Sequence, residues 1–236
     1  MIRFKNVKFV LNNLKVLSKL NDVVKMQFDE SGLRMFCVDK SVISLSVFAL
    51  KPEFFEEFYT KKATLWIDIN KLIAVLKRVK DECVVFEPKQ KALSITIEKG
   101  VWKRVFNINA DEEEAFEIPN VESMKYDECL IAETDKISKM LSDASLISDA
   151  ITLKAESNML NCFVKSVDDK YETTIECEGN MNAKSKYALD YMQIAFCNEI
   201  CRTYPHAKLC FKDNFPLKAI FNDTLIIYIA PRIDEE

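Results

Sequence analysis

Glycine and histidine are scarce in this sequence, and their scarcity excludes several kinds of catalytic site. The 236 residues include only 3 glycines and 1 histidine. Neither G-x-G-x-x-G nor G-x-x-x-x-G-K occurs, so a phosphate-cradling loop of either kind is excluded. His206 is the single imidazole available for acid–base chemistry, and no nucleophile–base pair is suggested. We therefore expect neither an enzyme nor a bound cofactor.

Long apolar runs are also missing. A membrane helix needs roughly 20 consecutive apolar residues, and no stretch approaches that length. Met1 is followed by Arg3, Lys5 and Lys8, so the apolar core of a signal peptide is not found. With 49% hydrophobic and 30% charged residues, the composition is that of a globular protein with sizeable cores. We expect an intracellular protein, cytoplasmic or, in a eukaryotic source, nuclear.

The 8 cysteines form no C-x-x-C pair. Cys197 and Cys201 are one helical turn apart, and His206 and Cys210 could join them as metal ligands. A second cysteine pair at zinc-finger spacing is absent, so a metal site is the weaker interpretation. We expect reduced, largely buried thiols and no metal.

The order of predicted elements is repeated, which indicates two similar domains. Residues 61–86 and 184–211 share a strand–helix–strand plan, at an offset of about 120 to 125 residues. Each half is predicted to combine β-strands with two helices on one face, an α+β fold. The expected domains are 1–109 and 129–236, joined by a connecting loop at 110–128.

Apolar periodicity places the individual elements. A strand is expected over Met1–Phe9 and a helix from Val10, and Thr134 or Asp135 is expected to cap the third helix. Asp68 or Asn70 is expected to cap the second helix. The fourth helix is predicted as one segment, Leu189 to Cys201.

Basic side chains fall on the outward faces of the first three predicted helices, although the chain carries a net charge of -4. They are Lys15, Lys19, Lys71, Lys77, Arg78 and Lys139. Carboxylates are concentrated elsewhere, at Glu53, Glu56, Glu57, the linker, Asp168, Asp169 and the final Asp234–Glu236. A basic helical face without a base-reading cluster or stacking aromatics is suited to sequence-independent contact with a phosphate backbone. The fourth helix breaks this rule, since only Arg202 stands at its edge.

The linker Ala110–Glu128 combines acidic and apolar residues. The acidic run Asp111–Glu114 should hold the backbone at the surface. Pro119 biases Ile118 towards extended geometry. The segment is therefore predicted to be an exposed crossover that displays Phe116 and Ile118. The alternative is an acidic loop with Phe116 packed onto a core.

Several segments resemble the DNA sliding clamps of the proliferating cell nuclear antigen (PCNA) family, especially the archaeal ones. They are YIAPRIDEE at Tyr228–Glu236, the run from Ser31–Gly32–Leu33 through Val38–Asp39 to Ile43–Ser44–Leu45, FPLKAIF at Phe215–Phe221, and Ile118–Pro119 in the linker. The resemblance spans the chain and implies a ring of three two-domain subunits around duplex DNA. It also implies that no catalysis takes place and that the protein is associated with the nucleoid.

The resemblance further implies partners and a docking site. DNA polymerase, clamp loader, flap endonuclease and DNA ligase would bind through short hydrophobic peptides. The pocket residues carried over by position are Val38, Val42, Ile43, Leu45, Phe116, Ile118, Pro119, Pro216, Tyr228, Ala230 and Pro231. Ring closure would pair a strand at about Val101–Asn109 with one at about Tyr171–Glu178 of the next subunit.

Two departures keep alternatives open. Val42 stands where many clamps have histidine, which could change peptide preference. The fourth helix lacks the usual basic residues, so the chain could be one subunit of a heterotrimeric clamp rather than of a homotrimer. A monomeric processivity subunit that grips DNA with one basic face is a further hypothesis.

Overall fold

Two compact α+β units make up the computed structural model, which describes residues 1–111 and 114–233. Unit 1 comprises Met1–Lys40 and Ser46–Ile118, and unit 2 comprises Ser41–Leu45 and Pro119–Glu236. Two acids of the predicted linker, Glu112 and Glu113, and the acidic ending Asp234–Glu236 lie outside the described residues. No helix in the described part of the chain has the length and hydrophobicity to cross a membrane.

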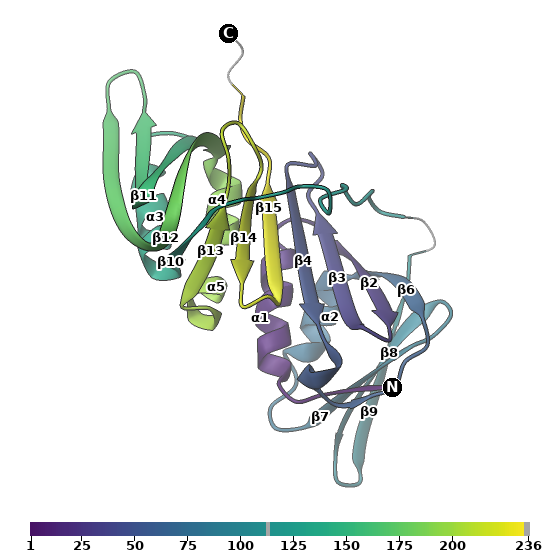
Figure 1. Ribbon diagram of the computed structural model, residues 1–236. Helices are drawn as coiled ribbons and strands as arrows, with labels where there is room; N and C mark the ends of the chain where they lie inside the picture. The colour runs from purple at the N-terminus through teal and green to yellow at the C-terminus, as the bar shows by residue number, and fades with distance from the viewer. Residues whose placement is uncertain (112–113, 234–236) are drawn as a thin grey trace. The chain divides into compact units, whose positions relative to one another are not determined.

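Unit 1 contains two sheets and two helices (Figure 1). One sheet has the order β5-β1-β7-β8-β9, and the strands β4-β3-β2-β6 are neighbours in the other. The strands are β1 (Ile2–Phe4), β2 (Val23–Asp29), β3 (Gly32–Val38), β4 (Ser44–Leu50), β5 (Phe55–Phe58), β6 (Ala63–Asp68), β7 (Cys83–Pro88), β8 (Ala92–Lys99) and β9 (Trp102–Asn109). The helices are α1 (Val7–Leu17) and α2 (Ile69–Leu76), and a 3₁₀ turn covers Pro52–Phe54.

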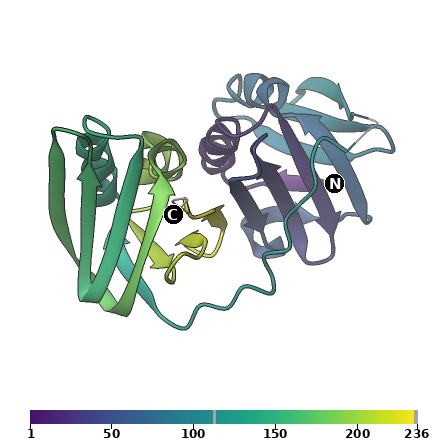
Figure 2. The same cartoon turned by 90° about the horizontal axis from the view of Figure 1, so that it is seen from above.

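Unit 2 repeats the combination of strands and helices (Figure 2). Its strands run in the order β11-β12-β10-β13-β14-β15. They are β10 (Cys129–Glu133), β11 (Ala150–Lys165), β12 (Lys170–Ala188), β13 (His206–Cys210), β14 (Leu217–Phe221) and β15 (Leu225–Ile229). The helices are α3 (Thr134–Ala144), α4 (Leu189–Ala195) and α5 (Asn198–Thr203).

Side-chain caps start the two helices of unit 1. The Asn6 side chain accepts a hydrogen bond from the Phe9 amide at 3.0 Å, and Asp68 accepts one from the Lys71 amide at 2.9 Å. The prediction that Asp68 could cap the second helix is confirmed. The predicted strand Met1–Phe9 is too long: it covers only Ile2–Phe4, because Asn6 already caps α1. The predicted helix start at Val10 is therefore three residues too late.

The predictions for the other two helices need correction. The Thr134 hydroxyl is buried and donates to the Tyr204 carbonyl at 2.6 Å, so it does not cap α3. Asp135 does not cap α3 either, because it lies in the first turn and the N-cap residue is Glu133. The predicted fourth helix is divided into α4 and α5, because the backbone leaves helical geometry at Phe196 (φ -120°, ψ 33°) and Cys197 (ψ 169°). Phe196 is nevertheless buried, with its ring 5.6 Å from that of Phe221. The apolar period continues across the break, which is why it suggested a single helix.

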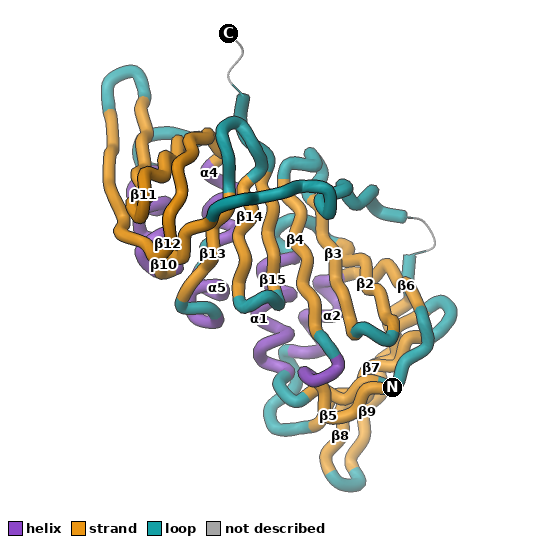
Figure 3. Tube along the Cα trace, viewed as in Figure 1, coloured by secondary structure: helices purple, strands orange, loops and turns teal. Residues whose placement is uncertain are grey.

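The helices of unit 2 cover one face of β13–β15. Leu217, Ala219 and Phe221 alternate along β14 and are fully buried, and Phe221 packs against Phe196 and Tyr204 on the helical side. The intervening Lys218 and Ile220 point to the opposite face and are partly exposed. We call this opposite face the outer face of unit 2; Figure 3 shows the linker passing across it, with the helices behind.

Candidate functional sites

The helices of unit 1 carry cations and no acidic side chains. Neither α1 nor α2 contains an aspartate or a glutamate. Of the predicted cations, Lys15 and Lys71 lie on the helices, and Lys19, Lys77 and Arg78 lie just past the helix ends. Lys15 is half-buried and the other four are exposed. Lys71 also pairs with the capping Asp68 at 3.2 Å. The side chains of the two helices themselves therefore present only positive charge to an approaching anion.

Lys8 is a cation of this surface that the sequence prediction missed. Because α1 begins at Val7 rather than Val10, Lys8 lies on the helix, two turns before Lys15 and on the same face. Lys8 is exposed. The capping asparagine Asn6 is the sequence signal that would have identified it.

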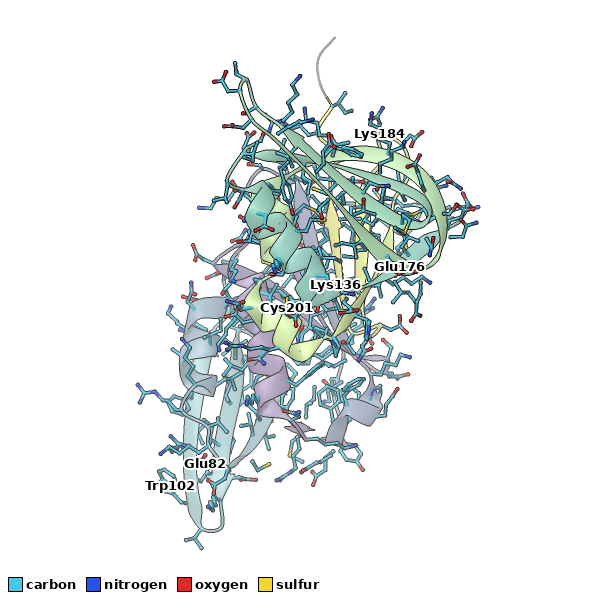
Figure 4. The ribbon with its side chains drawn as sticks, turned by 90° about the vertical axis from the view of Figure 1, so that its left-hand side faces the viewer. Glu82, Trp102, Lys136, Glu176, Lys184 and Cys201 are labelled. Atoms are coloured by element: carbon cyan, nitrogen blue, oxygen red, sulfur yellow. A yellow bond between two sulfur atoms is a disulfide. The ribbon has the colours of Figure 1, made fainter. Side chains whose placement is uncertain are left out.

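The helices of unit 2 are mixed in charge. Lys139 is exposed on α3, as predicted, but α3 also contains Asp135 and Asp143. Lys136 is bound to Glu133 at 2.7 Å. That contact, more than the nearby Glu176 of β12 (Figure 4), raises the pKa of the Lys136 ammonium. The positive helical surface is therefore concentrated in unit 1.

A row of paired residues crosses the outer face of unit 2. Cys210 is opposite Lys218, and Lys218 is opposite Tyr228. On the far side of Tyr228, its carbonyl accepts a hydrogen bond from the Ser44 hydroxyl at 3.1 Å, and the Ala230 amide donates to the Ile43 carbonyl at 2.8 Å. The segment Ser41–Leu45 is thereby held beside the chain end.

The end of the linker is fixed on this outer face. The Tyr126 hydroxyl donates to the Pro216 carbonyl at 3.0 Å, and its ring packs edge-on against Phe215. Asp127 binds Lys212 at 2.7 Å, and Glu128 accepts from the Asn182 amide at 3.2 Å. Burial, followed by the neighbouring Tyr228, raises the pKa of Tyr126, so its hydroxyl stays protonated and able to donate.

Cys210 is the last residue of the row on the side of β10, where it forms a disulfide with Cys129. The prediction of reduced thiols is therefore wrong for this pair. The two cysteines are one step along the register from the Leu130–Leu209 pair, with Cα atoms 4.3 Å apart. The other six cysteines are free. The strand pattern of the sequence did not show the register of the two strands, so it could not pair these two thiols.

Because Cys210 is in the disulfide, the metal-ligand set considered from the sequence, Cys197, Cys201, His206 and Cys210, is incomplete. Among the described residues, no group of three or more histidine, cysteine, aspartate or glutamate side chains could hold a metal ion.

The residues carried over as a peptide pocket differ in accessibility. Ile43, Pro119, Pro216, Ala230 and Pro231 are partly exposed, and Val42 is 59% exposed. Val38 and Leu45 are buried and offer little surface to a partner, while Tyr228 is 8% exposed. In unit 1, Ile118 is partly exposed and Phe116 packs edge-on against Trp66, with ring centroids 4.8 Å apart. Phe116 therefore has the core contact that the alternative interpretation of the linker described.

Val42 has an unusual backbone conformation. Its φ of 56° lies in the left-handed region, which β-branched residues rarely adopt. The hydrogen bonds of Ile43 and Ser44 to the chain end hold the neighbouring backbone in place. A β-branched residue in the left-handed region is a strained backbone conformation, and strained conformations are often found at binding sites.

Two similar α+β units, with helices and a linker on opposite faces of the second, define the fold class of ring-forming DNA clamps. Residues 2–114 match the family model for the proliferating cell nuclear antigen, N-terminal domain. A DNA polymerase sliding clamp of Nanoarchaeum equitans is 25% identical, over 99% of each chain. Another, of Methanothermobacter thermautotrophicus, is 27% identical, over 93% of this chain and 92% of that one. The chain belongs to the PCNA family of DNA sliding clamps.

Solved structures agree on the fold. The PCNA of Entamoeba histolytica superposes with a TM-score of 0.85 at 22% identity. A PCNA2–PCNA3 complex from Sulfolobus tokodaii gives a TM-score of 0.83 at 20% identity. Each comparison covers 98% of both chains.

Proposed function

We propose that this chain is a non-catalytic sliding clamp, one subunit of a ring that encircles duplex DNA and tethers replication and repair enzymes to it. The observation that supports the DNA contact is that helices α1 and α2 contain basic but no acidic residues, in a chain whose net charge is -4. Lysine contacts to phosphate are individually weak and independent of sequence. A ring that encloses the duplex needs only weak contacts, because it is held by topology.

The ring would close through unpaired strand edges. Among the described strands, β9 is the last strand of its sheet, and Tyr171–Glu176 of β12 pairs only with β11. The β9 edge carries Lys103, next to an Arg104 that is already paired with Glu82 at 2.6 Å, whereas the β12 edge carries Glu172 and Glu176. Opposite charge on two unpaired edges of one chain favours head-to-tail pairing between copies. This charge pattern supports self-association over a monomeric processivity subunit.

The native mass of the purified chain tests this arrangement. A trimer by light scattering at micromolar concentration is the expected result. Reversing Glu172 and Glu176 to Lys is expected to give monomers, and combining this change with Lys103→Glu is expected to restore part of the assembly. A wild-type chain that is monomeric alone but trimeric with clamp paralogues of its source would establish the heterotrimer instead.

Client enzymes would dock on the outer face of unit 2. The accessible side chains of the segment Ser41–Leu45, the end of the linker and the chain end gather there, and apolar surface of this kind is suited to short hydrophobic peptides. We assign DNA polymerase, clamp loader, flap endonuclease and DNA ligase to this surface as a class of partner.

Replacing Tyr228 by Ala is expected to weaken peptide binding by roughly tenfold or more, since large aromatic side chains dominate interface energies. The measurement is fluorescence anisotropy with a labelled synthetic peptide that carries apolar anchors at helical spacing. Ile226→Ala is the matched control, because Ile226 precedes Tyr228 by two positions on the same face of β15. Equal affinity in wild type and Tyr228→Ala would place the docking site elsewhere.

A further inference from the structure

Lys218 occupies a central position on the outer face of unit 2. It lies on β14, between Cys210 on one neighbouring strand and Tyr228 on the other. Its ammonium nitrogen is 5.6 Å from the ring centroid of Tyr228 and 5.8 Å from that of Tyr126. The cation therefore stands between an aromatic residue of the chain end and one of the linker.

The charge of Lys218 is not neutralised within the described part of the chain. Its contacts there are the two aromatic rings, and no carboxylate lies within ion-pair distance. Asp127 of the linker is paired with Lys212, and Glu122 contributes, after burial, to raising the pKa of Tyr228. Both tyrosines keep their protons, because burial raises their pKa values, so neither phenol supplies a negative charge.

Partial burial gives this cation a preference for anions. Lys218 is only partly exposed, and a partner that covered it would remove more of its water. Covering an unpaired charge is costly, whereas covering it with a carboxylate replaces water by an ion pair. A second cation at this position would be repelled.

We propose that Lys218 selects among partner peptides, and favours those that carry a carboxylate next to their apolar anchors. This inference rests on the proposed docking function of the same surface. It adds the chemistry of the preferred partner: an acidic, hydrophobic peptide rather than a hydrophobic peptide of any charge.

Peptide pairs that differ only in Glu and Gln test the selection. A synthetic peptide with apolar anchors at helical spacing is prepared with Glu, or with Gln, at each of five positions beside the anchors. Wild-type protein is expected to bind the best Glu peptide roughly two- to fivefold more tightly than its Gln counterpart, the range for a partly exposed ion pair. The preference is expected to shrink as salt is raised.

Lys218→Met keeps the length and apolar character of the side chain and removes its charge. This variant is expected to bind both members of each pair equally. Lys208→Met is the matched control, because Lys208 pairs with Ile220 on the same face and is one row away. The control is expected to keep the wild-type preference, and both variants should melt at the wild-type temperature.

The outcomes separate the two levels of the proposal. Equal binding of Glu and Gln peptides by the wild type at all five positions would overturn the role of Lys218 while leaving the docking surface intact. A preference that survives in Lys218→Met would do the same. Failure of every peptide to bind the wild type would overturn the docking function itself.

Discussion

A variant with reversed charges on its helices is expected to leave DNA roughly tenfold or more sooner than the wild type, because each lost phosphate contact removes a favourable electrostatic term and each glutamate adds repulsion. The four changes are Lys15→Glu, Lys19→Glu, Lys77→Glu and Lys139→Glu. Retention is measured as the half-life of labelled protein on nicked circular DNA after loading. The wild-type half-life should also shorten as salt is raised.

The matched control carries the same change of net charge away from the helices. Its substitutions are Lys61→Glu, Lys62→Glu, Lys89→Glu and Lys208→Glu, all at exposed positions. This control should retain wild-type behaviour. Linearising the circular DNA should release the wild type from its ends, which identifies topological linkage. Equal half-lives for the two quadruple variants would contradict the placement of the DNA surface on the helices.

Reducing the Cys129–Cys210 disulfide is expected to have the largest effect on stability. The bridge joins residues separated by 81 positions. In the chain-entropy model, a loop of that length contributes about 4 to 5 kcal/mol. The melting transition of unit 2 should therefore fall by roughly 15 to 20 °C when reductant is added. Differential scanning calorimetry with and without reductant measures the difference.

The double variant Cys129→Ser/Cys210→Ser controls for the six free cysteines. It should melt at the lower temperature and should not respond to reductant. Thiol titration of the denatured, non-reduced wild type should count six thiols. A count of eight, with a melting temperature unaffected by reductant, would show that the bridge does not form.

Local sequence information was enough to place most elements. Val10, Leu14 and Leu17 in α1, and Ile137, Met140 and Leu141 in α3, are buried as their spacing predicts. The errors arose where a side chain has a tertiary role. Thr134 resembles a helix cap, but its hydroxyl is committed to Tyr204, seventy positions away.

The candidate sites were predictable only in part. Charge counts along the chain identified the basic helices, because helical periodicity sorts residues onto faces without any tertiary information. The outer face of unit 2 depends on strand register, and register brings Cys210, Lys218 and Tyr228 into one row. Neither Lys218 nor the disulfide could be identified before that pairing was known.

The opposite placement of helices and linker in unit 2 has a thermodynamic consequence. A polyanion bound along α3 and a peptide lying over Tyr228 share no side chain and do not compete for volume. Their binding free energies should therefore add, as they do for distant, independent sites. Occupancy of the helical side then leaves the affinity of the outer face for peptide unchanged. One bound peptide can therefore replace another while the protein stays on DNA.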